Sequence, residues 1–307
     1  ACLVGSEMCI RDRYSVDLLA AINGSPTQGF GYTTLMTNNG KMVNRGVEIT
    51  LSGEIIRQKD FSWSASLLYA FNRNKVKHIS VQPSLWDSRI SMPTSYPMVG
   101  KPLYGIYAYK WAGLNENGDP QVYDAENNVT SGPARDYHAL VYCGTTVPIH
   151  NASLTNVLRY KGFEFSAMLI LDAGHKLRSS NIPSINMSNG RITSTAKGIV
   201  DRWTQPGDVT DVPRLLFSND TENFNTHRTE LYRYSDLFVY DASNIRLSNI
   251  SLAYRVPAHW CKKISLSGAR LQFNVENVAT FAFDSKANYD LGGKVKPNYV
   301  WGLYLNF

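Results

Sequence analysis

Apolar and polar residues alternate with a period of two along four long stretches of the chain. These stretches cover 42–57, 61–75, 163–174 and 269–278. Successive side chains of a β-strand point to opposite faces, so this alternation predicts strands with one apolar and one polar face. In the first stretch the apolar side consists of Val43, Val47, Ile49, Leu51 and Ile55.

With shorter candidates included, the pattern predicts ten strands, at 14–20, 42–57, 61–75, 103–112, 120–124, 152–160, 163–174, 244–256, 269–278 and 298–307. The connections between them alternate between long and short. Short turns on one side and long loops on the other are typical of a transmembrane β-barrel, whereas a soluble sandwich has no reason to gather its long loops at one end. We therefore predict an all-β fold, part of an antiparallel transmembrane β-barrel, with the turns 58–60 and 161–162 on the same side as Phe307.

One predicted strand changes phase in its middle. Ile245 and Leu247 share one parity, but Ile250 and Leu252 follow with the other. A slip of one residue near Ser248 keeps both halves apolar on the same face, which predicts a β-bulge.

The last predicted strand ends the chain on an apolar face. Its residues alternate so that one face holds Tyr299, Trp301, Leu303, Leu305 and Phe307. In water such a face needs a core beneath it, and its bare edge invites pairing with another strand. In a barrel, lipid covers the face and a neighbouring strand covers the edge.

Composition narrows the function classes. The net charge is +6, but the Lys and Arg residues are scattered, so nucleic-acid binding is not indicated. The four Cys residues form no CxxC pair and the six His residues have no ligand spacing, so no metal or other cofactor is expected. The longest aliphatic run, 167–171, is far too short for a membrane-spanning helix.

Carboxylates do not indicate an enzyme. Glu48, Glu54, Glu164 and Asp172 fall on polar strand positions that would face a barrel lumen. A pair of catalytic acids needs two carboxyl groups at a defined separation across one substrate, and the spacing of these four arranges no such pair. We therefore predict a protein that is not an enzyme.

The first thirteen residues, "ACLVGSEMCIRDR", are interpreted separately. They resemble a translated adapter sequence of the kind found at the ends of assembled reading frames. Residues 1–13 are therefore predicted to be non-native, and residues 14–307 to form the domain.

Six motifs carry a family resemblance: "GKMVNRGVEITLSG", "GKPLYGIYAYKWAGLNENGDPQVY", "LRYKGFEFSAMLILDAGHKLR", "DRWTQPGD", "YDASNIRLSNISLAYRVP" and "GLYLNF". Their order resembles the C-terminal barrel portion of SusC/RagA-type TonB-dependent outer-membrane transporters. The resemblance implies a 22-stranded plugged barrel, of which this chain would supply about ten strands, with the plug and the TonB-contacting segment upstream.

The resemblance also implies a function and partners. A glycan oligosaccharide, or a peptide, would be captured with a SusD-like surface lipoprotein and imported when the TonB energising complex acts on the plug. The location would be the outer membrane of a Gram-negative bacterium. The C-terminal strand resembles the signal read by the outer-membrane assembly machinery, through Gly302, Leu305 and Phe307, although Val300 stands where a polar residue is usual.

Three aromatic residues in the predicted extracellular loops are candidate substrate contacts: Trp86, Tyr96 and Trp203. Each has two interpretations, because an aromatic ring stacks on a sugar or anchors its own loop by packing. Gly46 likewise marks either a close approach of backbone or plug, or a kink in the strand.

Two other functions stay open from sequence. A passive porin or structural barrel would need no plug. A soluble carbohydrate-active β protein, perhaps an enzyme, is argued against by the one-sided loops and the missing acid pair, and it would extract without detergent.

Overall fold

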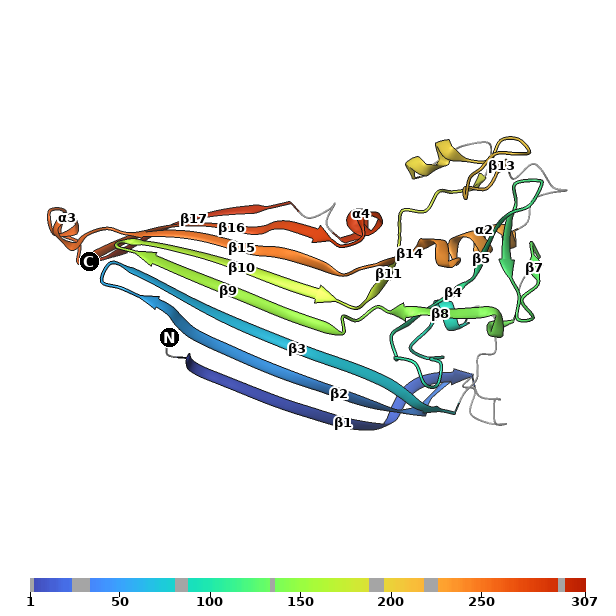
Figure 1. Ribbon diagram of the computed structural model, residues 1–307, viewed down its shortest axis with the longest axis horizontal. Helices are drawn as coiled ribbons and strands as arrows, with labels where there is room; N and C mark the ends of the chain where they lie inside the picture. The colour runs from blue at the N-terminus through green and yellow to red at the C-terminus, as the bar shows by residue number, and fades with distance from the viewer. Residues whose placement is uncertain are drawn as a thin grey trace.

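The structure is a computed structural model that describes residues 3–23, 34–80, 88–132, 136–187, 196–217, 226–291 and 296–307. Within these ranges one antiparallel sheet of eight strands dominates, in the order β1-β2-β3-β9-β10-β15-β16-β17 (Figure 1). Its strands are β1 Leu3–Asn23, β2 Thr34–Arg57, β3 Phe61–Ile79, β9 His150–Tyr160, β10 Phe163–Ala173, β15 Asn244–Arg255, β16 Gly268–Ala282 and β17 Asn298–Asn306. The predicted all-β antiparallel fold is confirmed.

The predicted number of barrel strands was too high, because two segments form small sheets outside the main one. Within 103–112 and 120–124 the chain forms β4 Gly105–Tyr109, β5 Trp111–Leu114 and β6 Pro120–Tyr123. β4 pairs with β8 Leu140–Thr145, and β6 pairs with β5 and with β7 Val129–Thr130. Every residue of β4 is buried, so β4 has no exposed apolar face to present to lipid. With these two strands removed from the main sheet, the connections between its strands still alternate between long and short.

The connections separate to the two ends of the sheet, as predicted. The turns 58–60 and 161–162 lie at the same end as the C-terminus, and the β15–β16 connection with α3 Ala258–Lys262 joins them there (Figure 1). The long connections after β3 and β10 lie at the other end. We call these the turn end and the loop end.

The register of the main sheet gathers apolar side chains into rows across neighbouring strands. The row nearest the turn end runs Phe61, Tyr160, Phe163, Tyr254, Leu271, Leu303, and the next runs Trp63, Leu158, Phe165, Leu252, Phe273, Trp301. These side chains are half-buried or exposed, and Trp301 is 76% exposed. The sheet therefore has one continuous apolar face, and we call the opposite face the polar face.

The predicted bulge is confirmed. The register of β15 shifts between Leu247 and Asn249 against both neighbours: Ser248 is the extra residue against β10, whereas against β16 the extra residue lies on β16, between Glu276 and Ala279. Gly46 shows a close backbone approach: a Cβ there would lie 2.8 Å from the Phe71 carbonyl oxygen of β3.

Beyond the sheet, the described parts of 88–149 and 174–243 fold together at the loop end, and we call them the loop assembly (Figure 1). It includes α1 Ser88–Ser91, α2 Thr226–Arg233, β11 Lys176–Arg178, β12 Asn186–Met187, β13 Leu216–Phe217 and β14 Val239–Asp241. Short 3-10 turns occupy Tyr137–Ala139, Lys197–Asp201 and Asp236–Phe238 there; Ser285–Ala287 and α4 Asn288–Leu291 lie in the β16–β17 connection. Among the described residues, no helix is both long and apolar enough to cross a membrane.

Candidate functional site at the loop end

The loop assembly has the hydrophobic core that the sheet lacks. One cluster is built from Tyr107, Tyr109, Val122, Ala139, Leu140 and Leu231, and a second from Ile185, Tyr232 and Phe238. Trp111 packs against both clusters. Burial raises the pKa values of Tyr107 and Tyr232, and the Tyr107 hydroxyl accepts a hydrogen bond from the Met98 amide at 2.9 Å. The loops are therefore a packed unit with a fixed shape.

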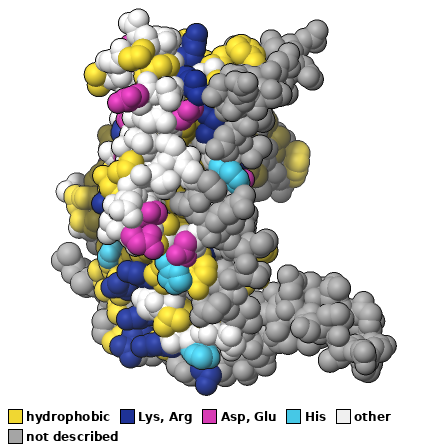
Figure 2. All heavy atoms as spheres, turned by 90° about the vertical axis from the view of Figure 1, so that its right-hand side faces the viewer, with side chains coloured by type: hydrophobic (Ala, Val, Ile, Leu, Met, Phe, Trp, Pro, Cys, Tyr) yellow, Lys and Arg dark blue, Asp and Glu magenta, His cyan; other side chains and the backbone are white. Residues whose placement is uncertain are grey.

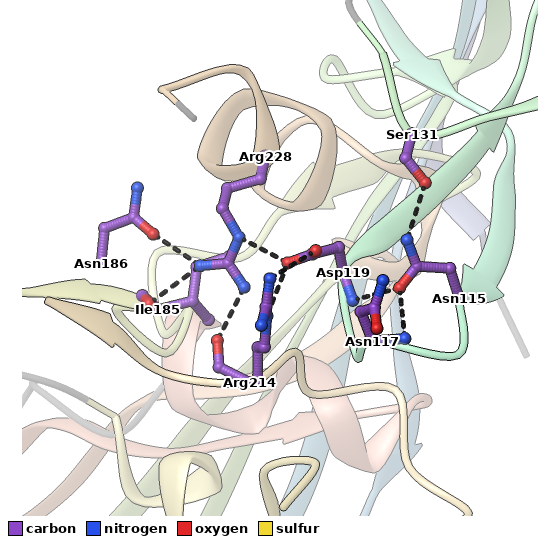
Figure 3. Close-up of polar contacts among 8 residues, drawn as sticks. All are labelled: Asn115, Asn117, Asp119, Ser131, Ile185, Asn186, Arg214 and Arg228. Carbon is purple, nitrogen blue, oxygen red and sulfur yellow. Dashed lines mark hydrogen bonds and ion pairs between the residues drawn. The ribbon is translucent and has the colours of Figure 1, made fainter. Parts of the chain in front are cut away.

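A charged network centred on Asp119 ties four segments of this unit together (Figure 3). Asp119 accepts from Arg214 at 3.1 and 2.9 Å and from Arg228 Nε at 3.1 Å. The Arg228 side chain is only 3% exposed, and it also donates to the carbonyls of Ile185 and Arg214 and to the Asn186 side chain. Burial lowers the pKa of Arg228, and Asp119 opposes that shift.

The turn that presents Asp119 is built by the sequence "NENGD". The Asn115 side-chain oxygen accepts hydrogen bonds from the Asn117 and Asp119 amides, both at 2.9 Å (Figure 3). Asn side chains favour this closure because they mimic a backbone turn. Asn115 also donates to Ser131 at 3.3 Å, which links the turn to the segment after β7.

Trp203 packs directly on this turn. Gly118 has φ +74, and a Cβ there would lie 2.4 Å from the Trp203 ring. The Arg214 amide donates to the Gly118 carbonyl at 3.0 Å, and the Trp203 amide to Val212 at 2.8 Å. The contact with Gly118 fits the interpretation of Trp203 as an anchor of its loop. Stacking on a sugar stays a prediction for the remaining half-exposed part of the ring.

Two of the sequence motifs meet at the base of the 174–243 connection. The Gly174 amide donates to the Ser243 hydroxyl at 3.0 Å, and Lys176 Nζ to Asp241 at 2.9 Å. Arg178 donates to the carbonyls of Tyr107, Arg233 and Ser235. Burial opposes ionisation of Asp241, but hydrogen bonds from Ser243 and Lys176 prevail and lower its pKa to about 2. "LDAGHKLR" and "YDASNIR" thus hold the two ends of the connection together.

The other candidate substrate contacts are placed differently. Tyr96 is only 7% exposed, and its carbonyl accepts from Arg89 Nε at 3.4 Å. Trp86 lies outside the described residues. A substrate role for either residue stays a prediction.

The polar face carries an ion-pair cluster near the turn end. Glu164 accepts from Arg159 Nε at 2.9 Å and from Arg270 Nη2 at 3.2 Å, so β9, β10 and β16 share one carboxylate. Glu54 instead pairs with Arg57 at 3.5 Å. Among the described residues, no group of three or more His, Cys, Asp or Glu side chains is placed to hold a metal ion.

The predicted assembly signal lies on the edge strand β17. Gly302 is opposite Gln272 and Leu305 opposite Ala269 of β16, and Phe307 is 92% exposed. Recognition of these residues by the assembly machinery stays a prediction.

Sequence reasoning missed Arg214 and Arg228 as partners of Asp119. Arg214 lies 95 positions and Arg228 109 positions after Asp119 in the chain, and no local pattern links them. The one available signal was the Asn and Gly content of "NENGD", which marks a tight turn but not its distant partners.

A comparison with protein-family models finds no match for this chain. Among curated proteins, the chain is 25% identical over 294 residues to TonB-dependent receptor P3 of Formosa agariphila, covering 89% of this chain and 28% of that protein. It is 22% identical over 263 residues to TonB-dependent receptor SusC of Bacteroides thetaiotaomicron, covering 81% and 24%. The chain thus spans less than a third of the length of these relatives.

Among solved structures, the fold is similar to that of the RagAB peptide transporter, with a TM-score of 0.73 at 22% identity, covering 98% of this chain and 33% of that chain. The RagAB peptide importer in its "closed-closed" state gives a TM-score of 0.71 at 21% identity, again covering 98% and 33%. The resemblance predicted from the six motifs is confirmed: the chain is SusC/RagA-like and has the fold of part of a TonB-dependent transporter.

Proposed function

We propose that this SusC/RagA-like chain forms, through residues 14–307, the C-terminal part of an outer-membrane barrel that imports a glycan oligosaccharide, or a peptide, with energy from TonB. The observation that carries the proposal is the continuous apolar face of the main sheet, which ends at a loop assembly on one side only. The names of the relatives as TonB-dependent receptors support it.

Each region has a part in this mechanism. The apolar rows contact lipid, and the polar face, with Glu164, Arg159 and Arg270, lines the lumen. Strands β1 and β17 are the edges of the sheet, and they pair with the remaining strands of a 22-stranded barrel, because backbone groups in hydrocarbon must be satisfied within the protein. Residues 1–13 are not native in this proposal, although residues from Leu3 onward pair with β2.

The loop assembly presents a fixed surface to the extracellular side. A SusD-like surface lipoprotein binds there and delivers the substrate. Trp86 and the exposed part of Trp203 contact the substrate. Tyr96 supports its own loop from inside. The assembly machinery recognises Gly302, Leu305 and Phe307 at the opposite end.

The proposal is tested by uptake in cells that express the complete polypeptide containing this chain. Labelled oligosaccharide and peptide pools are supplied in separate assays, with and without the tonB gene. We expect uptake of one pool, and its loss without TonB. Uptake that persists without TonB would favour the passive porin, and extraction of the protein into buffer without detergent would exclude a membrane barrel.

A further inference from the structure

The apolar face of the main sheet changes character towards the loop end. On β3 the residues facing the same way as Tyr69 and Phe71 continue as Arg73 and Lys75. The register places Arg73 opposite Arg45 and Lys75 opposite Val43 of β2, so the cationic row follows directly after the row of Phe71 and Val47. These charges therefore lie on the outward face and not on the polar, lumen-lining face.

These side chains line a cleft of about 470 Å³ together with Lys77, Phe71 and Pro102. Arg73, Lys75 and Lys77 are exposed, and within the described ranges none of the three forms an ion pair. Figure 2, which views the loop end, shows Lys and Arg side chains gathered in the lower part of that face. The register places Asp12 opposite Arg45, so the cations of the cleft without a facing acid in the register are Arg73, Lys75 and Lys77.

Hydrogen bonds to β3 hold the wall of the cleft that residues 100–103 form. The Val76 amide donates to the Lys101 carbonyl at 2.9 Å, and the Gly100 amide donates to the Val76 carbonyl at 2.9 Å. The Leu103 amide donates to the Asn74 side chain at 2.7 Å. Residues 100–103 thereby extend the sheet beside β3, and Gly100, with φ +86, makes the turn that forms the rim.

We propose that this cleft binds the phosphorylated head group of a glycolipid in the outer leaflet. The inference rests on the proposed function, because it takes the apolar face as lipid-facing and the loop end as extracellular. The cations would then lie at the level of lipid head groups, where Lys and Arg attract anionic lipid. Arg73 offers the planar fork that suits phosphate, and Phe71 continues the cleft into the apolar band. An imported substrate would pass along the opposite face.

The test uses the complete polypeptide purified from outer membranes in mild detergent. The triple variant Arg73→Gln/Lys75→Gln/Lys77→Gln is compared with wild type and with Lys262→Gln/Lys263→Gln, two exposed lysines at the turn end. Bound glycolipid is counted by native mass spectrometry, and rebinding is measured with lipid A, dephosphorylated lipid A and inorganic phosphate. A shift in gel migration between unheated and heated samples confirms that each variant is folded.

We expect the triple variant to bind lipid A about a hundredfold more weakly, because each of the three cations contributes about fivefold. The turn-end control should bind like wild type, and dephosphorylated lipid A should bind none of the three tightly. Equal lipid retention in the triple variant overturns the proposal, and so does inorganic phosphate that competes as well as lipid A. This experiment does not measure transport. A failure of the proposed import function in the uptake assay can therefore be distinguished from a failure of the proposed lipid site.

Discussion

The main sheet and the loop assembly use the same large side chains in opposite ways. In β17, Trp301 is 76% and Leu303 62% exposed, whereas in the loop assembly Tyr107 and Tyr232 are each 1% exposed. The sheet has an apolar face that no described part of the chain covers, whereas the loops pack aromatic rings around Trp111 as a soluble domain does. One chain thus contains a region whose apolar side chains are exposed and a region whose apolar side chains are buried by protein.

This difference explains where polar groups are tolerated. In the loop assembly a buried cation such as Arg228 requires Asp119 and several carbonyls as partners, because an unpaired buried charge is costly. On the sheet, charges such as Glu164 lie on the polar face, and the cations on the outward face, such as Arg73 and Lys75, lie on the loop-end side of the apolar rows. The predictions below test each half of the comparison.

The largest effect is expected from Asp119→Ala. Removing the carboxylate leaves the guanidinium of Arg228 buried without its charge partner, which costs about 3–5 kcal/mol. We expect the segments around 185 and 214 to open while the barrel stays folded, measured as faster amide hydrogen exchange there. Asp124→Ala is the matched control, since the Asp124 side chain accepts hydrogen bonds from Glu126 and Asn128 of its own turn and, among the described residues, has no ion pair. Unchanged exchange in Asp119→Ala would show that the network does not hold the loops.

The next effect tests the sheet. Leu169 lies in a row with Leu67, Leu154 and Leu247 in the middle of the apolar face. Arginine at the middle of a bilayer costs a barrel about 2–4 kcal/mol, so Leu169→Arg should lower the folded fraction in outer membranes. Its neighbour Met168 points to the polar face, and Met168→Arg should fold nearly normally. If both variants fold equally well, lipid does not cover the apolar face.

A smaller effect is expected from Gly118→Ala. A residue with a Cβ at φ +74 is strained by about 1–3 kcal/mol, and the added methyl group also displaces the Trp203 ring. We expect increased protease cleavage between 201 and 214. Gly207→Ala shares the positive φ but has open space around its Cβ, so it separates the strain from the clash. Equal cleavage in the two variants would mean that the Trp203 contact contributes nothing.

The smallest effect concerns pH. The pKa of Asp241 falls from an ordinary 3.8 to about 2 in the folded protein, so its stabilising contribution is present above pH 3.8 and is lost as pH falls through about 2. Because Asp241 and Lys176 are both more than a third exposed, the pair contributes less than about 1 kcal/mol. Pepsin cleavage of the 174–243 connection should therefore rise from pH 4 to 2. Asp241→Asn is cleaved in parallel to correct for the pH dependence of pepsin itself, and the ratio of wild-type to variant cleavage should rise over this range. A ratio that stays constant would contradict the prediction.

The sequence predicted the sheet better than the loops for a physical reason. A strand with lipid on one face and a lumen on the other must alternate in hydrophobicity along its whole length. The strand at 163–174 and the bulge near Ser248 could therefore be predicted without knowing which segments pair with them. The alternation at 103–112 is similar, yet there the aromatic side chains meet Leu231 and Leu140 from distant segments. The local pattern of apolar residues does not show whether an apolar strand face is covered by distant segments of the same chain or by lipid.

The interior of the loop end was unpredictable for the same reason. Asp119 lies in the connection between β3 and β9, whereas Arg214 and Arg228 lie in the 174–243 connection, and only the folded loops bring the three within hydrogen-bond distance. Trp203 was predicted to be a substrate contact or a loop anchor. Its contact with Gly118 depends on the "NENGD" turn, which lies 85 positions earlier in the chain (203 − 118 = 85). Long-range contacts of this kind leave no period in the sequence.

The extra residue at Ser248 fixes where β15 sits between its neighbours. Sliding β15 by one position would turn its side chains over, and sliding it by two would move the bulge away from the Met168–Leu169 step of β10 and from Asn277 of β16, whose φ is +54. A misaligned β15 would therefore leave backbone groups beside the bulge without their partners, which costs free energy. The bulge at Ser248 thus specifies one alignment of β15 against β10.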